Sequence, residues 1–172
     1  APPSTPRNAG GEKGSLVIQM DGEVGNYFLR GKLGEGTFGT VLKGTHKYAG
    51  EKVATKVLEK RRMQAADDIE RVGHEIAILK KLKHPHVVRL WEIVYTADRI
   101  CLAMEFVAKG ELFQYIVKQG RLREDEGRRF FNQIVDGVQY LHAQHVVHRD
   151  IKPENILLDG DRTVRIVDFG LS

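Results

Sequence analysis

The sequence predicts an α+β fold. An antiparallel sheet of five strands with one helix comes first, and a mainly helical part follows it along the chain. Five short apolar stretches between residues 27 and 107 are separated by turn residues, which is typical of antiparallel strands. A helical pattern at 65–82 interrupts them, and two further helical patterns follow the last strand. A hairpin pattern comes near the end, so sheet and helices are largely segregated along the chain.

Composition indicates one globular domain. The chain has 172 residues, of which 41% are hydrophobic, and this is enough for a single core. Its net charge of +4 comes from interspersed charges. The densest basic stretches, 60–62 and 80–83, are read as solvated helix ends rather than as a nucleic-acid surface. We therefore expect no nucleic-acid partner.

The single cysteine and the lack of long apolar runs bear on location. Only Cys101 is present, which rules out an intrachain disulfide and favours a reducing compartment. No apolar run approaches the roughly 20 residues that a membrane helix needs, so no membrane partner is expected. We expect a cytoplasmic protein, with the nucleus as a second location.

The two ends of the chain have distinct features. Residues 1–24 begin rich in Pro, Gly, Ser and Thr and are expected to form a disordered extension, with 16–18 as a weakly pairing exception. The first residue is Ala1 rather than Met, and the chain stops at Ser172. We expect both ends to be cuts in a longer protein.

A glycine-rich turn follows the first predicted strand, 27–33. Glycines at 34, 36 and 39 would let backbone amides approach a polyphosphate without obstruction by side chains. This spacing alone could also open a dinucleotide-binding unit. Here the residues after Gly39 read as a strand rather than a helix, which favours a glycine-rich hairpin with Val41 on its inner face.

A lysine and a glutamate are predicted to meet behind this hairpin. Lys56 lies in the alternating strand 53–58, and Glu75 lies on the helix 65–82, next to that helix's apolar face. A carboxylate that points inward needs a cation, and Lys56 is the natural one. The alternative, in which both residues are exposed, fits the neighbouring motifs less well.

Two strands, 87–95 and 99–107, complete the sheet, and short helices at 111–117 and 124–142 follow. Arg123 precedes the longer helix where Ser, Thr or Asp would cap it better, a weakness of about 1 kcal/mol. Histidines at 142, 145 and 148 suggest a metal site, but they straddle a helix end and a loop, so packing of His148 is the favoured interpretation.

The stretch 146–158 carries the residues for phosphoryl chemistry. Asp150 can accept a proton from a hydroxyl, Lys152 can neutralise a transferring phosphoryl group, and Asn155 can bind a divalent metal. A hairpin signal at 159–162 separates this stretch from Asp168. We expect Asp150 and Asp168 at opposite ends of the small ribbon, with two oxygen ligands suited to magnesium.

These motifs together resemble the catalytic core of the eukaryotic protein kinases, with His-Arg-Asp at 148–150 and Asp-Phe-Gly at 168–170. Lys-Pro-Glu-Asn at 152–155 resembles the serine/threonine kinases. The stretches 33–39, 110–116, 128–134 and 145–150 look similar to the AMP-activated/sucrose-non-fermenting-type kinases of the calcium/calmodulin-dependent group.

The resemblance implies a kinase-like fold with ATP and Mg²⁺ as cofactors. It divides the chain into an N-lobe at 25–104 with a regulatory helix, a hinge at 105–110, and the start of a truncated helical C-lobe with the catalytic loop at 111–172. It assigns catalysis to Asp150 and Lys152 with Lys56 and Glu75, and metal binding to Asn155 and Asp168. The implied nucleotide-binding residues are Leu33, Gly34, Glu35, Gly36, Thr37, Phe38, Gly39, Val41, Ala54, Lys56, Met104, Glu105, Val107, Glu111, Glu154 and Leu157.

The resemblance also implies partners. Protein substrates would offer Ser or Thr, and Glu111 with Glu154 would favour a basic residue before the acceptor. Arg149 implies control by an upstream activating kinase, and regulatory subunits are expected. Leu79, Leu90, His148 and Phe169 would stack as an internal spine.

Two small departures from the family pattern lie within the chain, and the large one is the absence of an activation segment. Thr55 replaces a usual apolar residue, and Gly73 interrupts the regulatory helix at a cost of about 1 kcal/mol. No activation segment follows Ser172, so we expect this stretch by itself to be inactive. The alternatives are a non-catalytic nucleotide-binding or interaction module and a kinase of small molecules.

Overall fold

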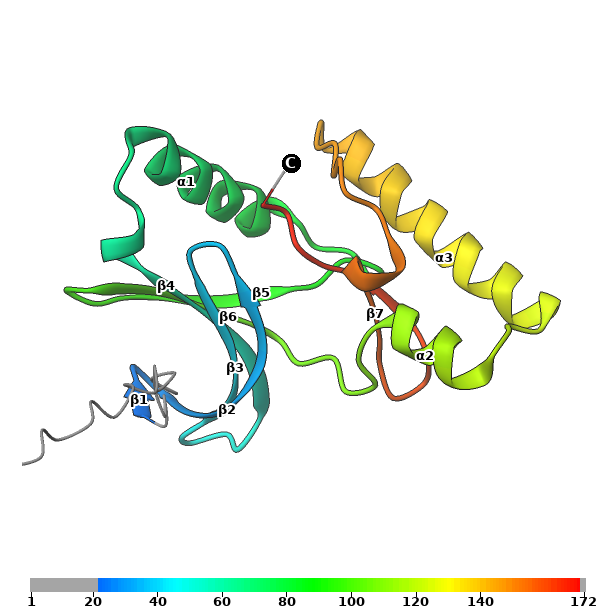
Figure 1. Ribbon diagram of the computed structural model, residues 1–172, viewed down its shortest axis with the longest axis horizontal. Helices are drawn as coiled ribbons and strands as arrows, with labels where there is room; N and C mark the ends of the chain where they lie inside the picture. The colour runs from blue at the N-terminus through cyan, green and yellow to red at the C-terminus, as the bar shows by residue number, and fades with distance from the viewer. Residues whose placement is uncertain (1–21, 171–172) are drawn as a thin grey trace, which may run out of the picture.

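The computed structural model describes residues 22–170. A strongly curled antiparallel sheet with one long helix forms one part, and two helices with a small hairpin form the other (Figure 1). The sheet has six strands in the order β1-β2-β3-β4-β6-β5. Their bounds are Gly22–Val24 for β1, Tyr27–Gly36 for β2, Gly39–His46 for β3, Lys52–Glu59 for β4, Leu90–Tyr95 for β5 and Arg99–Glu105 for β6.

The sheet therefore has one strand more than the predicted five. Strand β1 pairs with β2 across a two-residue turn, with Val24 opposite Tyr27. Gly25 adopts a φ of 54° in this turn, a conformation that glycine reaches without steric cost. The prediction of a disordered extension to residue 24 is thus wrong for Gly22–Val24, while the rest of it, including 16–18, lies outside the described residues.

Helix α1 covers one face of the sheet, and both faces bury apolar side chains. α1 runs from Ala66 to Lys81, with acidic residues in its first turn and lysines in its last, which suits the helix dipole. Val72, Ile76 and Leu79 of α1 join the larger core cluster, which continues into the second part of the molecule. The other face is closed by the curl of the sheet over a smaller cluster that contains Leu42, Val57 and Cys101.

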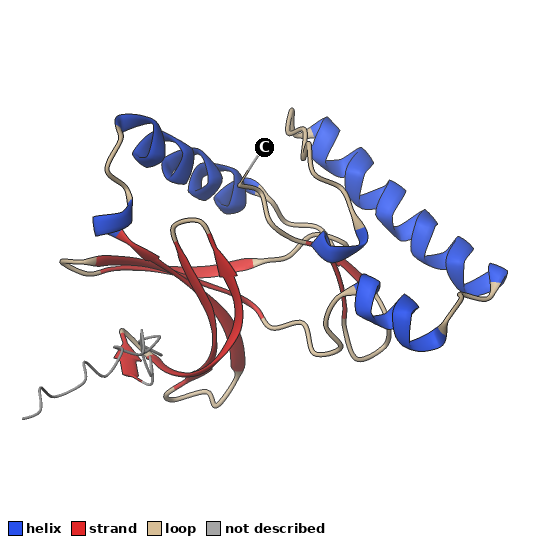
Figure 2. Cartoon of the chain, in the orientation of Figure 1, coloured by secondary structure: helices blue, strands red, loops and turns tan. Residues whose placement is uncertain are grey.

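The second part holds α2, Leu112–Gln119, and α3, Glu124–Ala143, beside the hairpin of β7, Ile156–Leu158, and β8, Val164–Ile166 (Figure 2). Short 3₁₀ turns occupy Lys60–Arg62 and Pro153–Asn155. α3 begins after Arg123 without a side-chain cap, as the sequence predicts. No helix of the described part is long and apolar enough to cross a membrane.

The segment before β5 joins the two parts. The sequence predicts a strand from residue 87, but β5 begins only at Leu90. Val87 instead forms a parallel bridge with Ile166, and the Val88 N–H donates to the Ile166 carbonyl at 3.0 Å. The backbone of this segment is therefore satisfied by the hairpin β7-β8, and this pairing fixes the hairpin against the sheet.

One buried hydroxyl in the sheet lacks a partner. Thr55 of β4 is only 1% exposed, and among the described residues its Oγ1 makes no hydrogen bond. A buried polar group without a partner retains its full desolvation cost.

We predict that Thr55→Val stabilises the chain, because valine has nearly the same shape and needs no hydrogen bond. The expected gain in unfolding free energy is about 1–2 kcal/mol. Thr45→Val is the matched control, since Thr45 in β3 is partly exposed and should change stability little. Thermal or urea unfolding measures both variants, and a Thr55→Val variant no more stable than the wild-type chain would contradict the prediction.

Candidate active site

The glycine-rich turn lies at the junction of β2 and β3. Gly36 pairs with Gly39 across the two turn residues Thr37 and Phe38. Phe38 packs against the larger core cluster, and its carbonyl accepts the Glu59 N–H at 3.0 Å. A Cβ on Gly39 would lie 1.7 Å from the Val57 carbonyl oxygen, so only glycine lets β3 approach β4 here. The turn therefore packs closely against β4. It joins two strands as a hairpin and does not lead into a helix.

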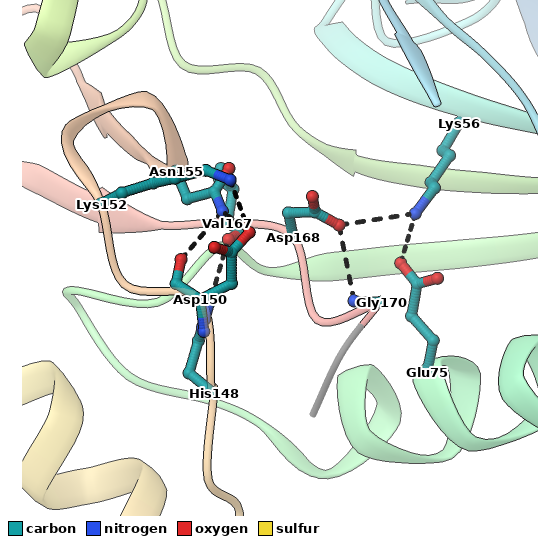
Figure 3. Close-up of polar contacts among 9 residues, drawn as sticks. All are labelled: Lys56, Glu75, His148, Asp150, Lys152, Asn155, Val167, Asp168 and Gly170. Carbon is teal, nitrogen blue, oxygen red and sulfur yellow. Dashed lines mark hydrogen bonds and ion pairs between the residues drawn. The ribbon is translucent and has the colours of Figure 1, made fainter. Parts of the chain in front are cut away.

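Lys56 lies at the centre of the site. It projects from β4, directly across from Val41 of β3, and its ammonium contacts the Glu75 carboxylate of α1 at 2.5 Å. The same ammonium is 3.9 Å from an Asp168 carboxylate oxygen (Figure 3). Glu75 is 6% exposed, and Lys56 provides the positive charge that this buried carboxylate needs. The predicted Lys56–Glu75 ion pair is confirmed.

Asp150, Lys152 and Asn155 form a second group. The Lys152 ammonium donates to an Asp150 carboxylate oxygen at 2.7 Å, and the Asn155 amide donates to the same oxygen at 2.9 Å. The hydrogen bond from Lys152 lowers the pKa of the Asp150 carboxyl below its ordinary value. The Asn155 amide also donates to the Asp150 carbonyl at 2.9 Å, so its oxygen faces away from this pair.

Asp150 and Asp168 lie at the same end of the hairpin β7-β8, and the prediction of opposite ends is wrong. The two strands are antiparallel, with Ile156 opposite Ile166, so the start of β7 and the end of β8 coincide. The Val167 N–H donates to the Asn155 carbonyl at 3.0 Å, which brings the two loops together. Figure 3 shows Asp168 between the Lys56–Glu75 pair and the Asp150 group.

His148 links the loop of Asp150 to the loop of Asp168. Its Nε2 donates to the Val167 carbonyl at 2.9 Å, and its Nδ1 accepts the Asp150 N–H at 3.3 Å. The ring also contacts Phe169, with ring centroids 5.0 Å apart. Leu79 and Phe169 belong to the larger core cluster, against which Leu90 packs. The prediction that His148 is a packed loop residue is confirmed.

The residues predicted for an adenine slot lie on neighbouring strands. Ala54 pairs with Met104, and Val41 pairs with Lys56, so these side chains share one face of the sheet. Leu157 approaches from the hairpin, where a bridge joins it to Glu111. Leu33 is 49% exposed, and the others named here are half-buried. This face therefore offers an apolar surface beside the Lys56 ammonium.

In the predicted hinge, 105–110, backbone groups rather than the Glu105 side chain are available to the predicted adenine slot. The Glu105 carboxylate binds Arg165 at 2.9 Å and its N–H bonds to the Arg89 carbonyl, so the Glu105 side chain does not face the slot. Within residues 22–170 the N–H and carbonyl of Val107 take no backbone partner. Glu154 is exposed, and Glu111 sits at the start of α2 without capping it.

Two oxygen donors in this site suit a hard divalent cation. The Asn155 amide oxygen and the Asp168 carboxylate are the kind of ligands that magnesium takes from a protein, in small number. Asp168 has a φ of 68°, and its Oδ1 accepts the Gly170 N–H at 3.4 Å, which orients the carboxylate. Within residues 22–170 no three His, Cys, Asp or Glu side chains are grouped so that they could hold a metal ion.

Comparison with known proteins agrees with this geometry. Residues 27–172 match the protein kinase domain. The chain belongs to the protein kinase family. It is 50% identical over 147 residues to the serine/threonine protein kinases OSK3 and OSK4 of rice, in both Oryza sativa subsp. indica and subsp. japonica. These matches cover 86% of the chain and 29% of each relative, so the chain spans less than a third of their length.

The contact between the segment before β5 and α3 could not be predicted from the sequence. His84 stacks on Tyr140 with ring centroids 4.6 Å apart, and its Nε2 lies 3.5 Å from Asp136. His86 lies 3.8 Å from the same carboxylate. The spacing of two histidines around Pro85 was the only signal in the sequence, and it does not reveal a partner fifty residues away.

We predict that Gly39→Ala destabilises the kinase fold by about 1–3 kcal/mol, because the added methyl group must push β3 away from β4. Gly36→Ala is the matched control in the same turn, where the nearest atom to an added Cβ is 3.9 Å away. Thermal unfolding of both variants measures the difference. Equal losses of stability in the two variants would contradict the close approach at Gly39.

Proposed function

We propose that the protein to which this stretch belongs is an ATP-dependent serine/threonine protein kinase, which transfers the γ-phosphoryl group to a protein hydroxyl. The observation that carries the proposal is the convergence of three elements on one point: Lys56 is paired with Glu75 and lies beside Asp168. A lysine held in this way can bind phosphate oxygens, and the apolar face next to it can take a purine. The family and the two rice kinases support the same activity.

The residues divide the reaction between them. Asp150 orients the substrate hydroxyl and accepts its proton. The hydrogen bonds from Lys152 and Asn155 hold its carboxylate in place for this role. Lys152, bonded to Asp150, lies where it can neutralise charge on the transferred group. The glycine-rich turn covers the phosphates with backbone amides. Catalysis then rests on positioning and on charge stabilisation.

Asn155 and Asp168 would hold Mg²⁺, which neutralises charge on the phosphates when it is bound. Their oxygen atoms fit this ion, and both side chains are oriented by the hydrogen bonds described above. Asn155 is buried, so its position is fixed by the fold rather than by the ligand.

Substrate choice and regulation extend the proposal. Glu111 and Glu154 make no ion pair within the described residues, so both carboxylates are free to attract a basic residue before the phosphoacceptor. Arg149 supports activation by an upstream kinase, since it adjoins the catalytic aspartate and pairs with no acid in the described part. Similarity at 33–39 and 145–150 supports an AMP-activated-type kinase with regulatory subunits, and the single buried Cys101 supports a cytoplasmic or nuclear location.

We predict that Asp150→Asn in the full-length protein lowers the turnover of a Ser-containing peptide by about 10²–10⁴, as expected for loss of a general base. Asp161→Asn, at the exposed tip of the β7-β8 hairpin, is the matched control and should leave turnover unchanged. Radiolabelled phosphate transfer measures both. Unchanged turnover in Asp150→Asn would overturn the proposed function.

A further inference from the structure

A cavity lies where the segment before β5 meets the end of β6 and the strand β8. Its volume is about 390 Å³, and we call it the rear cavity. Glu105 is the one residue assigned to nucleotide binding that lines it, and the Glu105 carboxylate binds Arg165. The rear cavity is formed by the segment before β5, the start of β5, the end of β6 and one arginine of β8, namely Lys83, His84, Pro85, Arg89, Trp91, Glu105 and Arg165.

The mouth of the rear cavity carries an exposed tryptophan. Trp91, the only tryptophan in the chain, is 52% exposed. The guanidinium of Arg89 lies over its ring, 4.4 Å from the centroid, and holds the indole in place. Pro85 is also exposed beside it. Tryptophan and arginine are the residues most enriched where protein partners bind tightly, so a rigid, exposed pair of them points to a binding surface.

The charges around the rear cavity do not balance. Arg165 is neutralised by two acids, Glu105 at 2.9 Å and Asp159 at 3.3 Å. Lys83 and Arg89 are exposed, and within the described residues neither forms an ion pair. The lining residues therefore include three cations, Lys83, Arg89 and Arg165, and one acid, Glu105, beside the rings of His84, Pro85 and Trp91. Asp159 and Asp136 are not lining residues and lie against Arg165 and His84.

We propose that the rear cavity docks an acidic peptide segment of a partner protein. One apolar side chain of the peptide enters the cavity against Trp91, and flanking carboxylates pair with Lys83 and Arg89. Two unpaired cations are too few for a nucleic-acid surface, which neutralises many phosphates, and the rings of Pro85 and Trp91 favour an apolar side chain over a phosphate. A second copy of this positively charged chain would also bring like charges together. This docking goes beyond the proposed function and does not depend on phosphoryl transfer.

The test uses fluorescein-labelled peptides with the common centre Phe-Leu and with acidic (Glu), neutral (Ser) or basic (Lys) flanks of two residues on each side. Fluorescence anisotropy gives affinity for the 172-residue chain, and quenching or shift of Trp91 emission locates the peptide, since no other tryptophan contributes. The acidic peptide is expected to bind at least tenfold more tightly than the basic one. Raising the salt concentration should weaken it.

Variants decide whether the rear cavity is responsible. Arg89→Glu and Trp91→Ala should each weaken binding of the acidic peptide at least tenfold, while Lys52→Glu, an exposed charge reversal at the far end of β4, should not. The proposal is overturned if the acidic and basic peptides bind with equal affinity, or if no peptide binds at 1 mM. It is also overturned if Arg89→Glu and Trp91→Ala bind the acidic peptide as tightly as Lys52→Glu does. The proposal would also be overturned if a ten-nucleotide oligothymidylate bound more tightly than the acidic peptide, or if the chain formed a dimer that Trp91→Ala abolishes. Either result would show that a different occupant binds the cavity.

Discussion

The Lys56 ammonium links the three elements that meet at the candidate active site. It comes from the sheet, pairs with Glu75 of the helix α1 and approaches Asp168 from the hairpin β7-β8. Glu75 is buried, and a buried carboxylate without its cation is costly, so the position of α1 against the sheet is coupled to the position of this lysine. A ligand that binds Lys56 therefore acts on three elements at once.

A second constraint keeps Asp150 in place relative to that lysine. The segment before β5 pairs with β8, and its two histidines approach α3, so the two parts of the molecule share backbone and side-chain contacts outside the hinge. His148 then links the loop of Asp150 to the loop of Asp168 through two hydrogen bonds and its contact with Phe169. These contacts hold Asp150 and Asp168 at a fixed separation, and such preorganisation is what the proposed catalysis by positioning would require.

Part of the site geometry could be predicted from the sequence and part could not. The glycine spacing, the strand that follows it, and the apolar face beside Glu75 predicted the hairpin and the Lys56–Glu75 pair, because each depends on local pattern and on the need to pair a buried charge. The relation of Asp150 to Asp168 was predicted wrongly, although antiparallel pairing of the hairpin alone places them at one end. Strand β1 and the switch of Val87 to Ile166 depend on pairing between segments, which no local pattern reveals. The rear cavity is likewise assembled from four segments, and its exposed tryptophan reads in sequence as an ordinary strand residue.

The most direct test of the central claim is calorimetric titration of the 172-residue chain with ATP, with and without Mg²⁺. We predict magnesium-dependent binding that Lys56→Met abolishes and that Lys52→Met, four residues earlier on the same strand, leaves intact. Loss of binding in Lys56→Met alone would show that the nucleotide site is built around this lysine. Binding that survives Lys56→Met, or a wild-type chain that binds no ATP, would contradict the claim that Lys56, Glu75 and Asp168 form a nucleotide site in this fold.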